Sequence, residues 1–144
     1  MNKSTIFGLS LGALVCAGLA IQLVPVPLTN PPVLSDIAAP AEVKAILKTS
    51  CYDCHSNESV WPWYSRVAPV SWLVAADAAR GRRHLNFSTW DGYPPEIRAK
   101  KLARTVREVA RGDMPPWYYT IKHTDAKLTP AQRSLLQTWA AQAK

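Results

Sequence analysis

The chain has 144 residues, enough for one domain with a modest core. Hydrophobic residues make up 48% of it and it holds six tryptophans, which excludes an intrinsically disordered chain. The net charge of +7 fits an anionic membrane surface or an acidic protein partner, and because no nucleic-acid-binding motif is present we expect no nucleic acid partner.

Near the N-terminus, Lys3 precedes an uncharged run whose apolar core is Ile6–Val24. Its length is close to the about 20 residues that cross a bilayer as a helix. A cation before such a run keeps the N-terminus in the cytoplasm, so the rest is exported, in a bacterium to the periplasm. Length favours a single-pass inner-membrane anchor over residues 1–24, with a cleaved signal peptide as the alternative. Cys16 is then a lipid-facing or packing residue.

Residues 25–39 are rich in proline and are predicted to form a semi-extended spacer between the membrane and the following domain. The alternative is a stretch wrapped on the domain surface. The domain itself is expected over residues 40–144. Its first helix is predicted from Pro40 to Ser50, with Val43, Ile46 and Leu47 on one face, and it leads directly into Cys51.

Cys51-Tyr52-Asp53-Cys54-His55 matches C-x-x-C-H, the signature of covalent c-type haem attachment. Two thiols at this spacing can bond to the two vinyl groups of one haem, and His55 can ligate its iron. A zinc half-site is disfavoured because the remaining candidates, Cys16, His84 and His123, form no second ligand pair. A redox dithiol would be expected in a βαβ setting, and no such pattern is present.

The aromatic stretch Trp61–Ser65 predicts a rigid apolar loop that contacts haem, with ordinary core packing as the alternative. Ser71 is then predicted to cap a helix from Trp72 to about Arg80, which Gly81 ends. Arg80, Arg82 and Arg83 form a basic cluster around that glycine, and a compact loop is expected over residues 85–90.

The clearest helix is predicted over residues 94–112. One face is apolar, and another carries a stripe of Lys100, Arg104, Arg107 and Arg111. Such a stripe is typical of a solvated face, and it also suits docking of an acidic redox partner or contact with haem propionates. A last helix is predicted from Thr129, where Thr129-x-x-Gln132 forms a capping box before an apolar face.

Met114 follows the long helix in a proline-rich loop and is predicted to be the sixth iron ligand opposite His55. A thioether is a soft ligand that stabilises Fe(II) and so raises the reduction potential. His84 and His123 are alternative ligands, and an open sixth position is a further alternative.

Four stretches together resemble the bacterial haem-binding domain family: CYDCHSN, WPWYSRVAPVSWLV, the GRxxLNFSxW pattern from Gly81 to Trp90, and GDMPPWYY. The resemblance covers about residues 20–140 and implies a small, exported, monohaem c-type domain. We expect an all-α fold like that of class I cytochromes c, around one covalent haem held by Cys51, Cys54 and His55. The role of Met114 is by analogy with those cytochromes.

These features predict a periplasmic monohaem cytochrome that transfers electrons to a redox protein, with an acidic protein as one candidate partner. A non-enzymatic carrier is favoured. The alternative is a haem enzyme or ligand-binding sensor with an open sixth iron position, for which His84 or His123 could supply an acid–base group.

Overall fold

Helices are the only regular elements in residues 2–143, the part of the chain that this computed structural model describes. The α-helices are α1 (Lys3–Ala20), α2 (Ala41–Ser50), α3 (Tyr52–His55), α4 (Val70–His84), α5 (Pro95–Arg111), α6 (Trp117–Thr120) and α7 (Pro130–Gln142). Short 3-10 helices are η1 (Ile21–Leu23), η2 (Trp63–Arg66), η3 (Phe87–Gly92) and η4 (Thr124–Ala126). The prediction of a small all-α fold with an N-terminal apolar helix is confirmed.

The chain divides into two units, one made of Met1–Leu28 and Trp61–Asp77, the other of Thr29–Val60 and Ala78–Lys144. In the first unit, α1 and η1 form one apolar span of 21 residues, Lys3–Leu23, with no buried residue in its most apolar window. By length and composition this helix suffices for a membrane anchor or for a signal sequence.

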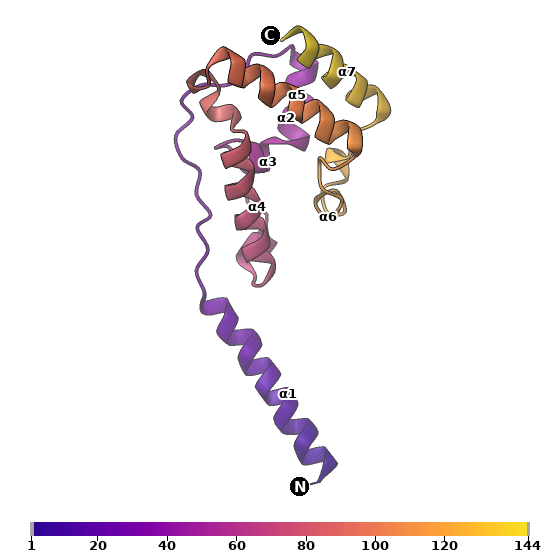
Figure 1. Cartoon of the computed structure of the whole chain (residues 1–144). Coiled ribbons are helices and arrows are strands. Elements are labelled where there is room, and N and C mark those ends of the chain that lie inside the picture. Colours follow the sequence, from indigo (N-terminus) through magenta and orange to yellow (C-terminus); the bar gives the residue numbers. More distant parts are fainter. Residues whose placement is uncertain (1, 144) are drawn as a thin grey trace. The chain divides into compact units, whose positions relative to one another are not determined.

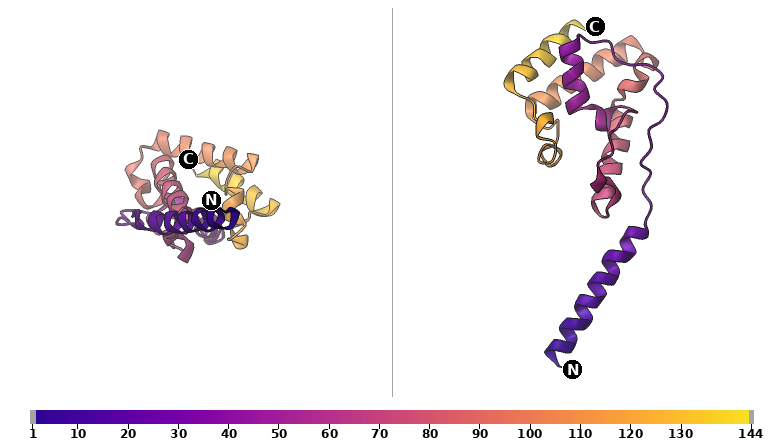
Figure 2. Two further views of the ribbon diagram at one scale, coloured as in Figure 1. Left: turned by 90° about the horizontal axis from the view of Figure 1, so that it is seen from below. Right: turned by 180° about the vertical axis from the view of Figure 1, so that it is seen from behind.

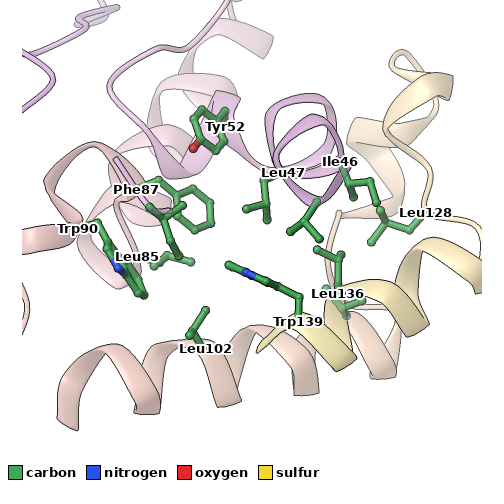
Figure 3. Packing of buried hydrophobic residues seen from close by; sticks show 13 residues of the cluster. Ile46, Leu47, Tyr52, Leu85, Phe87, Trp90, Leu102, Leu128, Leu136 and Trp139 are labelled. Carbon is green, nitrogen blue, oxygen red and sulfur yellow. The ribbon is translucent and has the colours of Figure 1, made fainter. Parts of the chain in front are cut away.

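The second unit is built around α2, α5 and α7, and α7 contacts both of the other helices. Figures 1 and 2 show the yellow helix α7 beside the orange helix α5, with the purple helix α2 against α7. Leu47 of α2, Leu102 of α5 and Trp139 of α7 point into the shared core (Figure 3). Tyr52 of α3 joins this core by stacking on Phe87, with ring centroids 5.1 Å apart.

The ends of α5 and α7 follow their sequence signals. Gly112 terminates α5 with a φ of 80°, a left-handed conformation that glycine adopts without steric cost. At the start of α7, the side chain of Thr129 accepts a hydrogen bond from the Gln132 N–H, and the Gln132 side chain accepts one from the Thr129 N–H. The predicted capping box and both helices are confirmed.

The helix predicted from Trp72 to Arg80 is longer than expected. α4 begins at Val70, so Ser71 lies inside its first turn instead of capping it, and α4 continues through Gly81 to His84. The prediction that Gly81 ends the helix was wrong. A glycine in a helix usually costs stability, but here the missing side chain permits a close backbone contact that is described below.

The later part of the proline-rich segment lies on the second unit. Leu34 and Ser35 donate backbone hydrogen bonds to the Ser88 carbonyl, at 2.9 and 3.2 Å. Ile37 is only 3% exposed and belongs to the core. The neighbouring Asp36 carboxylate lies 2.6 Å from the ammonium of Lys44 on α2. These contacts give residues 34–37 the wrapped arrangement, not that of a free spacer.

Candidate functional site

The two cysteines and the histidine of the C-x-x-C-H motif lie on a single turn of helix. Cys51 is the residue at which α2 ends and α3 begins. Its carbonyl oxygen accepts hydrogen bonds from the backbone N–H groups of Cys54 and His55, at 3.2 and 2.9 Å. Because residues three apart on a helix share a face, the two thiols are presented to the same side, as attachment to one flat group requires.

The His55 ring is oriented by two backbone carbonyls near the end of α4. Its Nδ1 lies 3.1 Å from the carbonyl oxygen of Gly81 and 3.1 Å from that of Leu85. Carbonyl oxygens only accept, so Nδ1 carries the hydrogen and the lone pair of Nε2 is left to bind a metal. Burial lowers the pKa of His55, although hydrogen bonds to the two carbonyls act in the opposite direction. The lowered pKa favours the neutral ring that an iron ligand needs.

The Cys51 thiol does not have the properties of a redox-active cysteine. Burial, with a smaller contribution from neighbouring Cys54, raises the pKa of Cys51 to about 12. Reactive dithiol cysteines have a lowered pKa and are thiolates near neutral pH. The environment of Cys51 therefore argues against the dithiol interpretation of the motif.

Gly81 allows α4 to lie directly against the motif (Figure 1). A Cβ atom built on Gly81 would come within 2.3 Å of the Cys54 carbonyl oxygen, far closer than such atoms approach each other. The same residue offers its own carbonyl to His55. The sequence-based prediction assigned Gly81 to a helix end and missed this role. A glycine within an otherwise helical pattern was the one signal in the sequence for a close backbone contact.

A buried polar network joins the residues after the motif to the loop after α4. The Asn57 N–H donates to the Ser88 hydroxyl at 2.9 Å, and Nδ2 of Asn86 donates to the side-chain Oδ1 of Asn57 at 2.9 Å. The Asn86 side chain also accepts from the Ser88 N–H at 3.0 Å. These three residues are at most 9% exposed, so their paired side chains avoid a large desolvation cost and fix the two segments together.

Arg82 joins the residues that directly follow the motif to residues 29 and 30, which precede it in the sequence. Its Nε donates to the Ser56 carbonyl at 2.7 Å, and its Nη atoms donate to the Thr29 carbonyl and to the side chains of Asn30 and Ser59. The sequence placed Arg82 in a basic cluster with Arg80 and Arg83. A run of arginines does not show which one will be drawn into a network.

Met114 follows the end of α5 and is 38% exposed. The left-handed turn at Gly112 lets the N–H groups of Asp113 and Met114 both donate to the Glu108 carbonyl, at 3.0 and 3.2 Å. The side chain therefore comes from a locally fixed turn, as a ligand-bearing loop requires.

The segment that follows Met114 exposes several large apolar side chains. Met114, Trp117, Tyr118 and Ile121 are 38%, 72%, 39% and 60% exposed. Clusters of exposed apolar side chains mark binding surfaces for other apolar groups. Tyr119, in the same segment, donates a hydrogen bond from its hydroxyl to the Asp53 carboxylate at 2.8 Å. The structure thus brings the Met114 segment to the C-x-x-C-H motif, a contact that the sequence did not reveal.

The two alternative histidine ligands have different surroundings. His84 is exposed at the end of α4, and its carbonyl accepts from the Lys101 ammonium. The His123 ring stacks on Tyr119, with centroids 4.2 Å apart and planes inclined by 11°. His123 is therefore the histidine that shares the segment of Met114 and contacts the residue bound to Asp53.

The family model described as "Haem-binding domain" matches residues 16–142, nearly the whole chain. The chain belongs to the haem-binding domain family. No curated protein and no solved structure matches it. The predicted family membership is confirmed, and with it haem as the group that this domain binds.

The residues present fit a haem. The His55 Nε2 is left as a ligand atom by the two carbonyls at Nδ1, and the two thiols share a face of the same helical turn. Exposed apolar side chains around Met114 suit contact with a large apolar ring. When bound, a haem supplies a one-electron couple at iron, and the surroundings that the chain provides set its potential.

Proposed function

We propose that this haem-binding domain is a monohaem c-type cytochrome that transfers electrons on the periplasmic side of the bacterial inner membrane. The observation that carries the proposal is the His55 ring, whose Nδ1 faces two carbonyl oxygens at 3.1 Å while two thiols stand on the same helical turn. A histidine fixed in this tautomer, beside two cysteines at vinyl spacing, is suited to a covalent five- or six-coordinate haem.

In the proposed attachment, Cys51 and Cys54 each add an S–H bond across one vinyl group. The sulfur bonds to the vinyl carbon next to the ring, and the hydrogen goes to the terminal carbon. Each addition consumes one carbon–carbon double bond and needs no external oxidant or reductant.

Met114 is the proposed sixth ligand. Its support is the fixed turn after α5 and the hydrogen bond between Tyr119 and Asp53, which holds the segment of Met114 at the motif. A His/Met pair favours Fe(II) and a high reduction potential, which suits an electron carrier. Electron transfer needs no proton-transfer group at the iron, so neither His84 nor His123 has a required role in this function.

A redox protein is the proposed partner, and an acidic surface on it would complement α5. Lys100, Arg104, Arg107 and Arg111 are all exposed. Arg104 also lies 3.5 Å from Glu108, a neighbour that reduces the local positive charge. Long-range attraction of this kind speeds association and weakens as salt screens it.

Absorption spectra of the purified exported protein, oxidised and reduced, with a pyridine haemochrome assay, test the central proposal. We expect one haem per chain that stays attached after denaturation and acid–acetone extraction, and a low-spin spectrum in both oxidation states. Haem that is extracted by this treatment would refute covalent attachment.

The second candidate function is a haem enzyme or ligand sensor with an open sixth position. The observation in its favour is the place of His123, stacked on Tyr119 within the Met114 segment, where it could act as an acid–base group. A high-spin resting spectrum and direct binding of CO to the reduced protein would support this function and remove Met114 from the sixth position.

A further inference from the structure

The end of the apolar N-terminal helix is joined to the loop between η2 and α4. The side-chain Nε2 of Gln22 donates to the Ala68 carbonyl at 3.1 Å, and its Oε1 accepts from the Ala68 N–H at 2.9 Å. Both ends of the amide therefore pair with one backbone residue, which fixes position and orientation together. All these residues belong to the first unit.

Gln22 stands where a membrane-spanning helix would leave the bilayer. The apolar span Lys3–Leu23 has 21 residues, and at about 1.5 Å per residue it matches the about 30 Å of a bilayer hydrocarbon core. Gln22 is then at the hydrocarbon boundary, on the periplasmic side. Ala68, held against it, lies at the same depth.

The loop around Ala68 exposes an unusual amount of apolar side chain. Trp63, Val67, Val70, Trp72 and Leu73 are 76%, 43%, 43%, 37% and 49% exposed. Arg66, an exposed cation, lies among them. Tryptophan is enriched where hydrocarbon meets the headgroups, and arginine can reach lipid phosphates from there.

We propose that residues 63–73 form a membrane-contacting loop that lies in the boundary between headgroups and acyl chains of the periplasmic leaflet. The bilayer is the occupant that the contacts favour, because the loop is bonded to the end of the apolar helix and exposes side chains typical of that boundary. The protein then holds the membrane twice, with α1 across it and with this loop on its surface. This inference rests on the proposed retention of α1 as an anchor.

Photo-crosslinking of the full-length holoprotein tests the inference. The protein is placed in phosphatidylcholine vesicles that contain a phosphatidylcholine with a diazirine near the glycerol end of one acyl chain. Trypsin cleaves after Arg66 and Arg80, so the peptide Val67–Arg80 is released without the haem-attachment cysteines. We expect lipid adducts on this peptide and on α1, and none on the peptide that begins at Ser134 in α7, which also contains leucines and a tryptophan.

Two variants sharpen the test. Replacing Val67, Val70 and Leu73 together by serine makes three exposed apolar side chains polar. Because these side chains are exposed, the haem spectrum should be kept while lipid adducts on the loop are lost. Gln22→Ala removes both hydrogen bonds to Ala68 and should decrease the loop adducts, while those on α1 stay unchanged.

Adducts on α1 with none on Val67–Arg80 would overturn the inference. The loop would then face haem, as its aromatic residues predict, or water. Absence of the α1 sequence from the intact mass of the purified protein would overturn the anchor itself and with it this inference. Neither result changes the haem spectrum, so the proposed cytochrome function is tested independently.

Discussion

The Tyr119 hydroxyl donates a hydrogen bond to Oδ2 of Asp53 at 2.8 Å, across 66 positions of sequence. Asp53 lies between the two cysteines of the motif, and its other carboxylate oxygen accepts from the Val60 N–H at 2.9 Å. One carboxylate therefore connects the C-x-x-C-H turn, the chain that follows it and the segment that carries Met114. This hydrogen bond brings the segment that follows Met114, remote in sequence, to the motif.

Tyr119→Phe tests that relation because it removes the hydroxyl and keeps the ring. Loss of a hydrogen bond to a charged group should lower the free energy of unfolding by about 1.5 kcal/mol. If Met114 is the sixth ligand, the sulfur-to-iron charge-transfer band should also be lost at lower urea concentrations than in the wild type. Urea titrations that follow this band and the helical signal measure both effects.

The control for Tyr119→Phe is the same change in an Asp53→Ala background. In that background the tyrosine hydroxyl has no carboxylate partner, so removing the hydroxyl should change the free energy of unfolding little. An equal cost in both backgrounds would show that the Tyr119–Asp53 contact contributes nothing.

Gly81→Ala should destabilise the protein although it improves helix propensity. Within a helix, alanine in place of glycine raises the free energy of unfolding by about 1 kcal/mol through its higher helix propensity. Against this, the new Cβ would lie 2.3 Å from the Cys54 carbonyl oxygen, a backbone atom that cannot move without shifting α3. Overpacking of this kind costs about 1–3 kcal/mol, and the severity of the clash places this site at the upper end. Thermal unfolding and the yield of haem-bearing protein measure the result.

Gly92→Ala is the matched control, since no heavy atom lies within 4 Å of a Cβ built there. It should leave stability and haem content nearly unchanged. If Gly81→Ala were as well tolerated as Gly92→Ala, α4 would not need its close approach to the motif.

Asp36 is expected to give stability that is lost in acid. Burial alone would raise the pKa of Asp36, but hydrogen bonds from Lys44 and Tyr52 and the Lys44 charge hold it below its ordinary value. A carboxyl group with a depressed pKa in the folded state stabilises the fold above its unfolded pKa of about 4, and this contribution is lost as pH falls through the folded pKa. Asp36→Asn should therefore be less stable at pH 7 and lose less stability below pH about 4.

Urea unfolding midpoints between pH 7 and pH 3 test the role of Asp36. Asp91→Asn serves as the control, because the Asp91 side chain is 69% exposed and lies 3.7 Å from Arg98, a surface contact that contributes little. Identical pH profiles for the wild type and Asp36→Asn would contradict the stabilising role.

The sequence predicted what depends on local patterns. The helix ending at Gly112 and the capping box at Thr129 are set by a few adjacent residues, and the structure has both. The C-x-x-C-H motif is equally local, and it indicated a haem-binding domain, which the family match confirms. Gly81 was misassigned because glycine ends helices more often than it lies within them, and only the neighbouring Cys54 carbonyl shows why it is needed.

The remaining parts of the site depend on contacts between distant segments. Asp53 meets Tyr119, His55 meets the carbonyls of Gly81 and Leu85, and Arg82 reaches back to Thr29. A backbone carbonyl has no sequence signature at all, so neither carbonyl partner of the His55 ring could be predicted. A tyrosine or arginine can be recognised in the sequence as a hydrogen-bond donor, but the sequence does not specify the distant residue to which it donates.

Met114→Ala decides between the candidate ligands at the sixth position. If Met114 binds iron, the variant should lose the sulfur-to-iron charge-transfer band, become high-spin or bind added CO and imidazole, and have a lower reduction potential. The matched control is His123→Ala, which leaves the methionine in place and should keep the low-spin spectrum and the band. The reverse pattern, an unchanged Met114→Ala spectrum and an altered His123→Ala spectrum, would assign the position to the histidine stacked on Tyr119. Spectra of both variants in both oxidation states, with a redox titration, distinguish these outcomes.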